Sequence, residues 1–257
     1  MLSLFWAELE RQWIQLRRYA TESIAGVIGL TVAFYGLFLT TQYVAGPVSQ
    51  FGDRLDAIVV GYVLWSLVVF IVGSIAGGLQ QEALTGTLEQ LFLAPYSAPQ
   101  IFVVRALANL VIQLLQNLGV LILIMGITGS RLAFPPLLVL PLVTVLLGAY
   151  GLALAVGSLA LLLKRVQQLL GFLPFGLVIL LMVPSESWSG GVRWLGWVLP
   201  MSPGAGLLRD LMARNQGLEW GLLAIAGLNG LVYFAIGIIL FQQAERVAKQ
   251  RGQISGY

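Results

Sequence analysis

The sequence contains no cysteine and no histidine, and charged residues make up only 10% of its 257 residues. Without these two residue types there is no thiol redox centre, no serine–histidine or cysteine nucleophile pair and no usual zinc site. A soluble domain carries about 25% charged residues, so this chain has too few charges to cover a water-exposed surface. These absences argue against a soluble enzyme, a metal site, a disordered chain and a nucleic-acid-binding protein.

Apolar residues take the place of the missing charges, at 58% of the chain. A helix needs roughly 20 apolar residues to cross about 30 Å of hydrocarbon. Six stretches meet or approach this length, and hydrocarbon leaves them no alternative to helix except a closed barrel, whose alternating pattern is absent. The sequence therefore predicts an all-α polytopic membrane protein with spans over residues 23–44, 57–79, 107–128, 137–163, 169–183 and 220–241.

The whole chain, residues 1–257, reads as one membrane domain. Residues 1–20 precede the bundle, residues 23–242 form it, and residues 243–257 follow it as a tail. Most of the 14 lysines and arginines fall on the side that holds both termini. Because cytoplasmic loops carry an excess of these residues, we expect both termini in the cytoplasm and the chain in the cell (inner) membrane.

The first 20 residues predict an amphipathic helix that lies in the membrane interface. Its apolar residues recur at helical spacing: Leu2, Phe5, Leu9, Trp13 and Leu16. The alternative is an ordinary charged extension of the chain on the cytoplasmic side.

A second amphipathic segment, residues 80–95, connects the second and third spans. Leu84, Leu88, Leu91 and Phe92 fall on one helical face, and Pro95 ends the pattern. Such a helix is too short and too charged to span, so we expect it at the cytoplasmic surface. It either docks a soluble partner or forms an interfacial turn without one.

The residues of this connection resemble the coupling-helix signature of the ABC type-2 permease family. The signature is carried by Glu82, Gly86, Thr87, Leu88, Glu89 and Leu91, followed by Leu93, Ala94, Pro95 and Pro99. The resemblance implies the membrane subunit of an ATP-driven exporter, paired as a homodimer or as a heterodimer with a second permease. It also implies two ABC ATPase subunits that bind ATP and magnesium, since this chain would bind no cofactor itself. Glu82 and Glu89 would contact the ATPase, and Gly86 would allow the backbone of this segment to approach the ATPase closely.

The outer connection, residues 184–219, is too long for a simple turn. Relatives in the family fold the matching region into short re-entrant helices, which fits residues 192–199 here. We interpret this region as an outer gate, or alternatively as ordinary tryptophan anchoring at the interface; the residues concerned are Trp188, Trp194, Trp197 and Pro203.

Amide side chains form a stripe along the third span, at Asn109, Gln113, Gln116 and Asn117. Amides that face lipid are costly, so the stripe faces protein or a wet pathway. It either lines a transport pathway or supplies hydrogen bonds between packed helices, and the packing interpretation is the simpler one. Tyr35 in the first span and Asn229 in the last either line a pathway or merely sit at span ends.

The energy for transport has no source within the chain. An ion-coupled pump requires charged residues at central membrane depth, and no predicted span carries one there. The phosphate-binding Gly-x-x-x-x-Gly-Lys-Ser/Thr loop is also absent, so the chain is not an ATPase by itself. We expect a transport subunit for an amphipathic or lipid-like substrate such as a drug, a lipid or a lipid-linked glycan. The alternative is a non-transporting membrane scaffold or assembly factor that docks a soluble partner through residues 80–95; an adjacent ATPase gene would favour export.

Overall fold

The computed structural model describes residues 2–45, 52–79, 98–162, 167–185, 188, 191 and 193–250, and all of its regular elements are helical. The elements in chain order are α1 (Leu2–Arg18), α2 (Ala20–Ala45), α3 (Gly52–Val72), η2 (Gly73–Gly77), α6 (Ala98–Thr128), η3 (Pro136–Leu138), α7 (Val139–Leu162), α8 (Gln167–Met182), α9 (Arg193–Val198), α10 (Ser202–Met212) and α11 (Trp220–Gln250). This architecture agrees with the all-α class that the sequence predicts.

Five helical stretches in the described part of the chain are long and apolar enough to cross a membrane. They are Ala20–Thr40, Leu55–Gly77, Val104–Thr128, Pro136–Leu162 and Trp220–Ala248, and they match the predicted first, second, third, fourth and last spans. The predicted fifth span corresponds to α8, which has 16 residues. At about 1.5 Å per residue, α8 is roughly 24 Å long and falls short of the hydrocarbon thickness.

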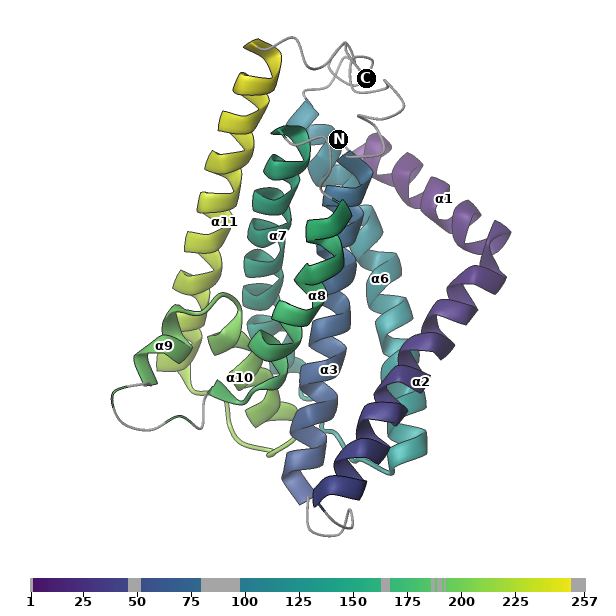
Figure 1. Cartoon of the computed structure of the whole chain (residues 1–257), viewed down its shortest axis with the longest axis vertical. Helices are drawn as coiled ribbons and strands as arrows, with labels where there is room; N and C mark the ends of the chain where they lie inside the picture. The colour runs from purple at the N-terminus through teal and green to yellow at the C-terminus, as the bar shows by residue number, and fades with distance from the viewer. Residues whose placement is uncertain are drawn as a thin grey trace.

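The long helices run alternately up and down in one bundle (Figure 1). The beginning of α1 and the end of α11 lie at the same end of the bundle, whereas α9 and α10 lie at the opposite end. We call these the terminal end and the hairpin end. Helix α11 continues to Gln250, so the first residues of the predicted tail prolong the last helix.

Helix α3 forms the centre of the core. More than half of its apolar stretch is buried, and its side chains contact α6, α7, α8 and α10. Val59, Val68 and Val72 have no or almost no exposed surface. Composition alone does not decide this position, because α2 is similarly apolar on all sides and is nevertheless mostly exposed.

Helices α7 and α11 pack along much of their length. They approach most closely at Gly151 and Gly237, where a Cβ on either glycine would overlap backbone atoms of the other helix. Small residues permit this contact because no side chain separates the two backbones. The pair therefore forms an interlocked unit.

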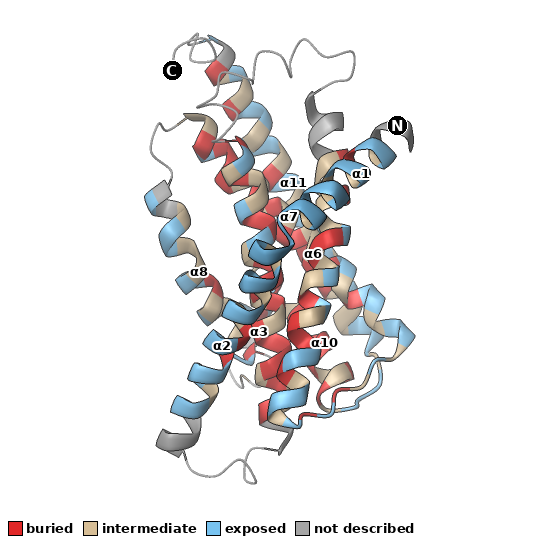
Figure 2. Cartoon of the chain, turned by 90° about the vertical axis from the view of Figure 1, so that its right-hand side faces the viewer, coloured by how far each residue is buried: buried red, intermediate tan, exposed pale blue. Residues whose placement is uncertain are grey.

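Helix α2 is attached to the bundle by a narrow stripe. Thr31 and Phe34 are buried, while Ile28, Val32 and Leu37 are exposed, and Figure 2 shows the blue exposed surface that covers most of this helix. Helix α8 also presents large exposed apolar side chains. These faces are suited to lipid or to another apolar surface.

Helix α1 is a separate helix that packs on α6. Phe5 and Leu9 of the predicted apolar face are half-buried. Trp13 is instead exposed, and Glu8 is buried beside Arg105 of α6, at 3.5 Å between Oε1 and Nε. The face of α1 that contacts the bundle therefore includes Glu8 and leaves out Trp13. The ion pair with Arg105 compensates the burial of the Glu8 carboxylate.

Candidate functional site

The residues with the strongest sequence signal, Glu82, Gly86, Thr87, Leu88, Glu89 and Leu91, lie outside the described residues. The described structure reaches the segment from both sides, through Leu79 at the end of α3 and η2 and through Ala98 at the start of α6. Both positions belong to the terminal end of the bundle (Figure 1). The role of the segment itself stays a prediction.

The helix that leads into this segment changes its winding just before it. Residues Gly73–Gly77 form a π-helix, η2, which continues α3 and contacts α7. Within it, the Ser74 hydroxyl donates to the Ile71 carbonyl at 2.9 Å. Short π-helical turns are rare, because their wider winding is less stable than an α-helix. Those that occur are frequently found at functional sites. The three glycines of this region, at 73, 77 and 78, were its only signal in the sequence.

The amide stripe of α6 is partly buried. Gln113 and Asn117 are buried, whereas Asn109 and Gln116 are half-buried. Asn117 Oδ1 accepts a hydrogen bond from the Ser66 hydroxyl of α3 at 2.5 Å, and its Nδ2 donates to the Gln113 carbonyl at 3.2 Å. Asn117 therefore makes the kind of interhelical hydrogen bond that the packing interpretation describes.

Tyr35 lies on the outer side of α2, where 40% of its surface is exposed, and its ring is 6.2 Å from that of Phe38. It faces away from the core of this chain. A role for Tyr35 or for the amide stripe in lining a pathway stays a prediction.

Asn229 of α11 joins the two short helices of the hairpin end. Its Nδ2 donates to the carbonyls of Trp197 at 2.8 Å and Leu199 at 3.1 Å, at the end of α9. Its Oδ1 accepts from the Met201 backbone N–H, just before α10, at 3.2 Å. One turn further along α11, the Tyr233 hydroxyl donates to the Val198 carbonyl at 2.8 Å. Asn229 thus caps a helix end and a helix start at once.

Arg209 is the largest fully buried side chain in the described part of the chain, with 1% of its surface exposed. It belongs to α10, and its guanidinium donates a hydrogen bond to the carbonyl of Leu181 in the last turn of α8. A cation is favourable at this position because carbonyls at the end of a helix lack partners and carry partial negative charge. The same carbonyl lies against Gly61 of α3, where a Cβ would come within 2.9 Å of it. Arg209 therefore sits where α3, α8 and α10 meet.

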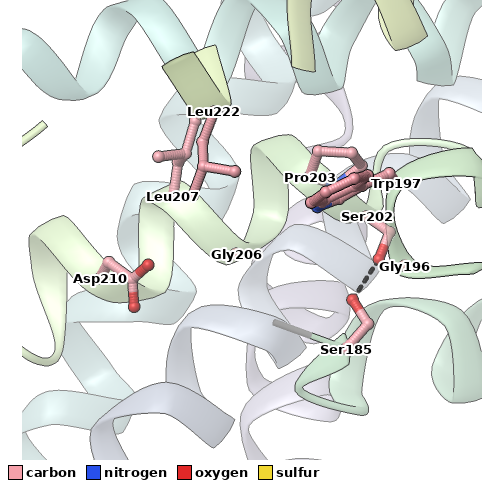
Figure 3. Close-up of a pocket in the computed structure, with 9 residues that line it drawn as sticks. All are labelled: Ser185, Gly196, Trp197, Ser202, Pro203, Gly206, Leu207, Asp210 and Leu222. Atoms are coloured by element: carbon pink, nitrogen blue, oxygen red, sulfur yellow. Dashed lines mark hydrogen bonds between the residues drawn. The ribbon is translucent and has the colours of Figure 1, made fainter. Parts of the chain in front are cut away.

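A small cavity of about 50 Å³ opens beside α10 (Figure 3). At one end of it the hydroxyls of Ser185 and Ser202 point toward each other and form a hydrogen bond, and Trp197 and Pro203 lie close by. Asp210 lies further along α10 and pairs with Arg214 at 2.5 Å. The cavity has room for a few water molecules but not for a drug-sized ligand, which needs about 300 Å³ or more.

The tryptophans of the predicted gate differ in burial. Trp188 is half-buried, while Trp194 and Trp197 are exposed at 56% and 40%. Exposed tryptophans beside the buried helix α10 are compatible with interface anchoring and with a gate alike. Both interpretations stay open as predictions.

Sequence reasoning did not single out Tyr62 and Trp65 of α3, which bond to other helices. Tyr62 donates to the Leu30 carbonyl of α2 at 2.6 Å, and Trp65 Nε1 donates to the Pro174 carbonyl of α8 at 2.8 Å. The available signal was their spacing, since Tyr62, Trp65 and Ser66 are polar groups within one turn of an otherwise apolar helix.

The comparisons with known proteins agree with this architecture. No curated protein matches the chain significantly. A family model described as "ABC-2 family transporter protein" matches residues 38–239, which include the connection between α3 and α6, the amide stripe and the hairpin end. Because this match covers most of the chain, the protein belongs to the ABC-2 transporter family, whose members are membrane-spanning components of ABC transporters.

Proposed function

We propose that the chain is the permease subunit of an ATP-driven exporter in the cell (inner) membrane. All six apolar helices, α2, α3, α6, α7, α8 and α11, would span the bilayer, with both termini in the cytoplasm. The arrangement in Figure 1 supports this topology, because the beginning of α1 and the end of α11 share one end of the bundle. A short α8 is compatible with spanning where the bilayer thins locally.

The observation that carries the proposal is the family match over residues 38–239, which includes residues 82–91. No nucleotide-binding loop is present in the sequence. We infer that two copies of a separate ABC ATPase bind ATP and magnesium and act on the bundle through Glu82, Gly86, Thr87, Leu88, Glu89 and Leu91. A second permease, identical or related, would complete the pathway.

The substrate we propose is amphipathic or lipid-like: a drug, a lipid or a lipid-linked glycan. Two described features support this class. The buried amides of Asn117 and Asn229 bond to other parts of the protein, and large apolar side chains such as Phe172, Phe175 and Ile179 are exposed on α8. The two amides are thus engaged within the protein, and a substrate that passes along the exposed side chains of α8 meets mainly apolar groups. This favours a substrate with an apolar part.

Substitutions within residues 82–91, which we call the coupling segment, test the proposal. Gly86→Trp blocks a close approach of the ATPase and Glu89→Arg reverses a charge, so both should abolish substrate-stimulated ATP hydrolysis by the copurified complex. Gly217→Trp and Glu219→Arg make the same changes at the hairpin end, where a Cβ at Gly217 meets open space, and should leave hydrolysis unchanged.

Undiminished hydrolysis and transport in both coupling variants would contradict the assignment of this segment. A stable complex with a soluble partner but no nucleotide-driven transport in reconstituted vesicles would instead favour the scaffold function.

A further inference from the structure

One turn of the second span is wound more widely than the helix on either side of it. Residues Gly73–Gly77 form the π-helix η2, and the flanking residues Val72 and Gly78 both have ordinary α-helical backbone angles. Directly after η2, the Gly78 N–H already donates to the carbonyls of Ser74 and Ile75. The wide winding is thus confined to a single turn, which holds about one residue more than an α-helical turn.

Three glycines accompany this turn, and packing does not explain them. They are Gly73, Gly77 and Gly78, and a Cβ on any of them would meet no described atom of another part of the chain within 4 Å. In the α7–α11 contact, by contrast, a Cβ on Gly151 would overlap backbone atoms. Glycine is a poorer former of α-helix than alanine. We therefore attribute the three glycines to the backbone, where they weaken the α-helical alternative to the wide turn.

The helix before the turn is enclosed. Helix α3 contacts α6, α7, α8 and α10, and Val68, Ile71 and Val72 have 1% or less of their surface exposed. A movement of α3 as a whole would disturb all of these contacts at once, because a packed interior has few voids to move into. A displacement that begins beyond Leu79 is therefore most easily taken up between the enclosed part of α3 and the coupling segment, which is where η2 lies.

The turn itself is packed on one side only. Ala76 is buried on the side where η2 contacts α7, whereas Gly73 and Gly78 are exposed. Just after η2, Leu79 is 2% exposed, and a Cβ added to Gly157 of α7 would lie 2.9 Å from Leu79 Cδ1. The Leu79 side chain thus fills the space next to Gly157. The open side leaves the turn free to change its winding, and the contact between Leu79 and Gly157 marks its rotational position.

We propose that η2 is a convertible turn, whose π winding changes to α winding when the ATPase closes on ATP. An α-helix rotates by about 100° per residue, so a turn that gives up its extra residue rotates Leu79 and the coupling segment by roughly this angle. Helix α3 keeps its contacts, while Leu79 leaves Gly157. The ATPase shifts the equilibrium because it binds one of the two windings more tightly. This inference rests on the proposed function, since it requires an ATPase that acts on the coupling segment.

A disulfide between Leu79→Cys and Gly157→Cys reports the contact directly. The chain has no cysteine of its own, and Leu79→Cys removes the Cδ1 that the new Cβ would meet. The permease with this pair is copurified with its ATPase, reconstituted into vesicles, and oxidised without nucleotide or with ATP and vanadate. We expect the disulfide yield to fall at least about threefold with ATP and vanadate, because residue 79 has then turned away from α7.

The control pair lies on the same helix, α7, but does not involve η2. A Cβ on Gly148 would lie 2.7 Å from Met201 Cγ and 3.7 Å from Met201 Cα. Gly148→Cys with Met201→Cys should therefore form a disulfide as well. Its yield should be the same in both conditions, because this contact is far along α7 from the turn.

Two changes to the winding, made together with the cysteine pair, separate a convertible turn from a passive one. Gly73→Ala with Gly77→Ala favours α winding, because alanine is the better helix former, and should lower the disulfide yield without nucleotide. Deletion of Gly77 removes the extra residue and keeps the later residues on their faces. The disulfide should then form in both conditions, and the reduced complex should hydrolyse ATP at least about fivefold more slowly although the ATPase still copurifies. Gly171→Ala with Gly176→Ala on α8, where a Cβ also meets open space, is the matched control and should change neither readout.

The outcomes separate the two proposals. Equal yields of the disulfide at positions 79 and 157 with and without ATP and vanadate, in a complex that hydrolyses ATP, would overturn the convertible turn and leave the exporter assignment standing. So would normal hydrolysis by the deletion variant, or the absence of this disulfide without nucleotide. A chain that copurifies with no ABC ATPase would overturn the proposed function together with this inference.

Discussion

Asn229 of α11 accepts a hydrogen bond from the backbone N–H of Met201, a residue whose φ of 63° lies in the left-handed region. This conformation costs an ordinary side chain about 1–2 kcal/mol. Met201 nevertheless adopts it between α9 and α10, where its side chain is buried. The amide of Asn229 thus offsets local strain at the turn that connects the two short helices.

Asn229→Ala should destabilise the hairpin end by about 2 kcal/mol, because the Met201 N–H and the carbonyls at the end of α9 lose their partner. Hydrogen exchange followed by mass spectrometry should show faster exchange over residues 193–212. Tyr233→Phe serves as the graded control, since it removes only the bond to Val198 and should cost about 1 kcal/mol or less. Equal protection of this region in Asn229→Ala and the unchanged chain would contradict the capping role.

Gly237→Ala should lower the free energy of unfolding by about 1–3 kcal/mol, because the new methyl group overlaps the backbone of Gly151 and forces α7 and α11 apart. Equilibrium unfolding in mixed detergent micelles measures the change. Gly227→Ala is the matched control on the same helix: a Cβ there meets open space, so stability should stay the same or rise by about 0.5–1 kcal/mol. Similar stabilities of the two variants would show that the close approach is not required.

Arg209→Met should cost about 1.5–3 kcal/mol, because the Leu181 carbonyl at the end of α8 loses a charged donor in a buried place. Arg214→Gln, which breaks the partly exposed pair with Asp210, should cost less than about 1 kcal/mol. Thermal unfolding of the two purified variants gives the comparison. If Arg214→Gln proved the more damaging, the exposed pair and not Arg209 would hold α10 in place.

Much of the fold follows from the sequence, because long apolar runs have no stable alternative to helix in a membrane. The predicted spans over residues 23–44, 57–79, 107–128, 137–163 and 220–241 each match a described apolar helix. Ends were less well predicted. Helix α11 continues to Gln250 through polar residues that carry no apolar signal, and α6 begins at Ala98, ahead of Arg105, which interrupts the apolar run. The family, too, was predicted from a few residues of the connection between α3 and α6.

The candidate site was predicted less completely. The amide stripe identified Asn117 correctly as a residue that needs a partner, but not Ser66 as that partner. Glu8 lies within the segment predicted as an amphipathic interfacial helix, and it is buried against Arg105 of α6. A helical pattern gives the face on which a residue lies but not the element that covers this face.

Composition and periodicity by themselves determined that this chain is a helical membrane protein. Only the tertiary structure decided which helices α3 holds. Tyr62 and Trp65 bond to backbone carbonyls 32 and 109 residues away. Every residue has such a carbonyl, so the sequence carries no mark of the acceptor, and only the packing of the helices selects Leu30 and Pro174.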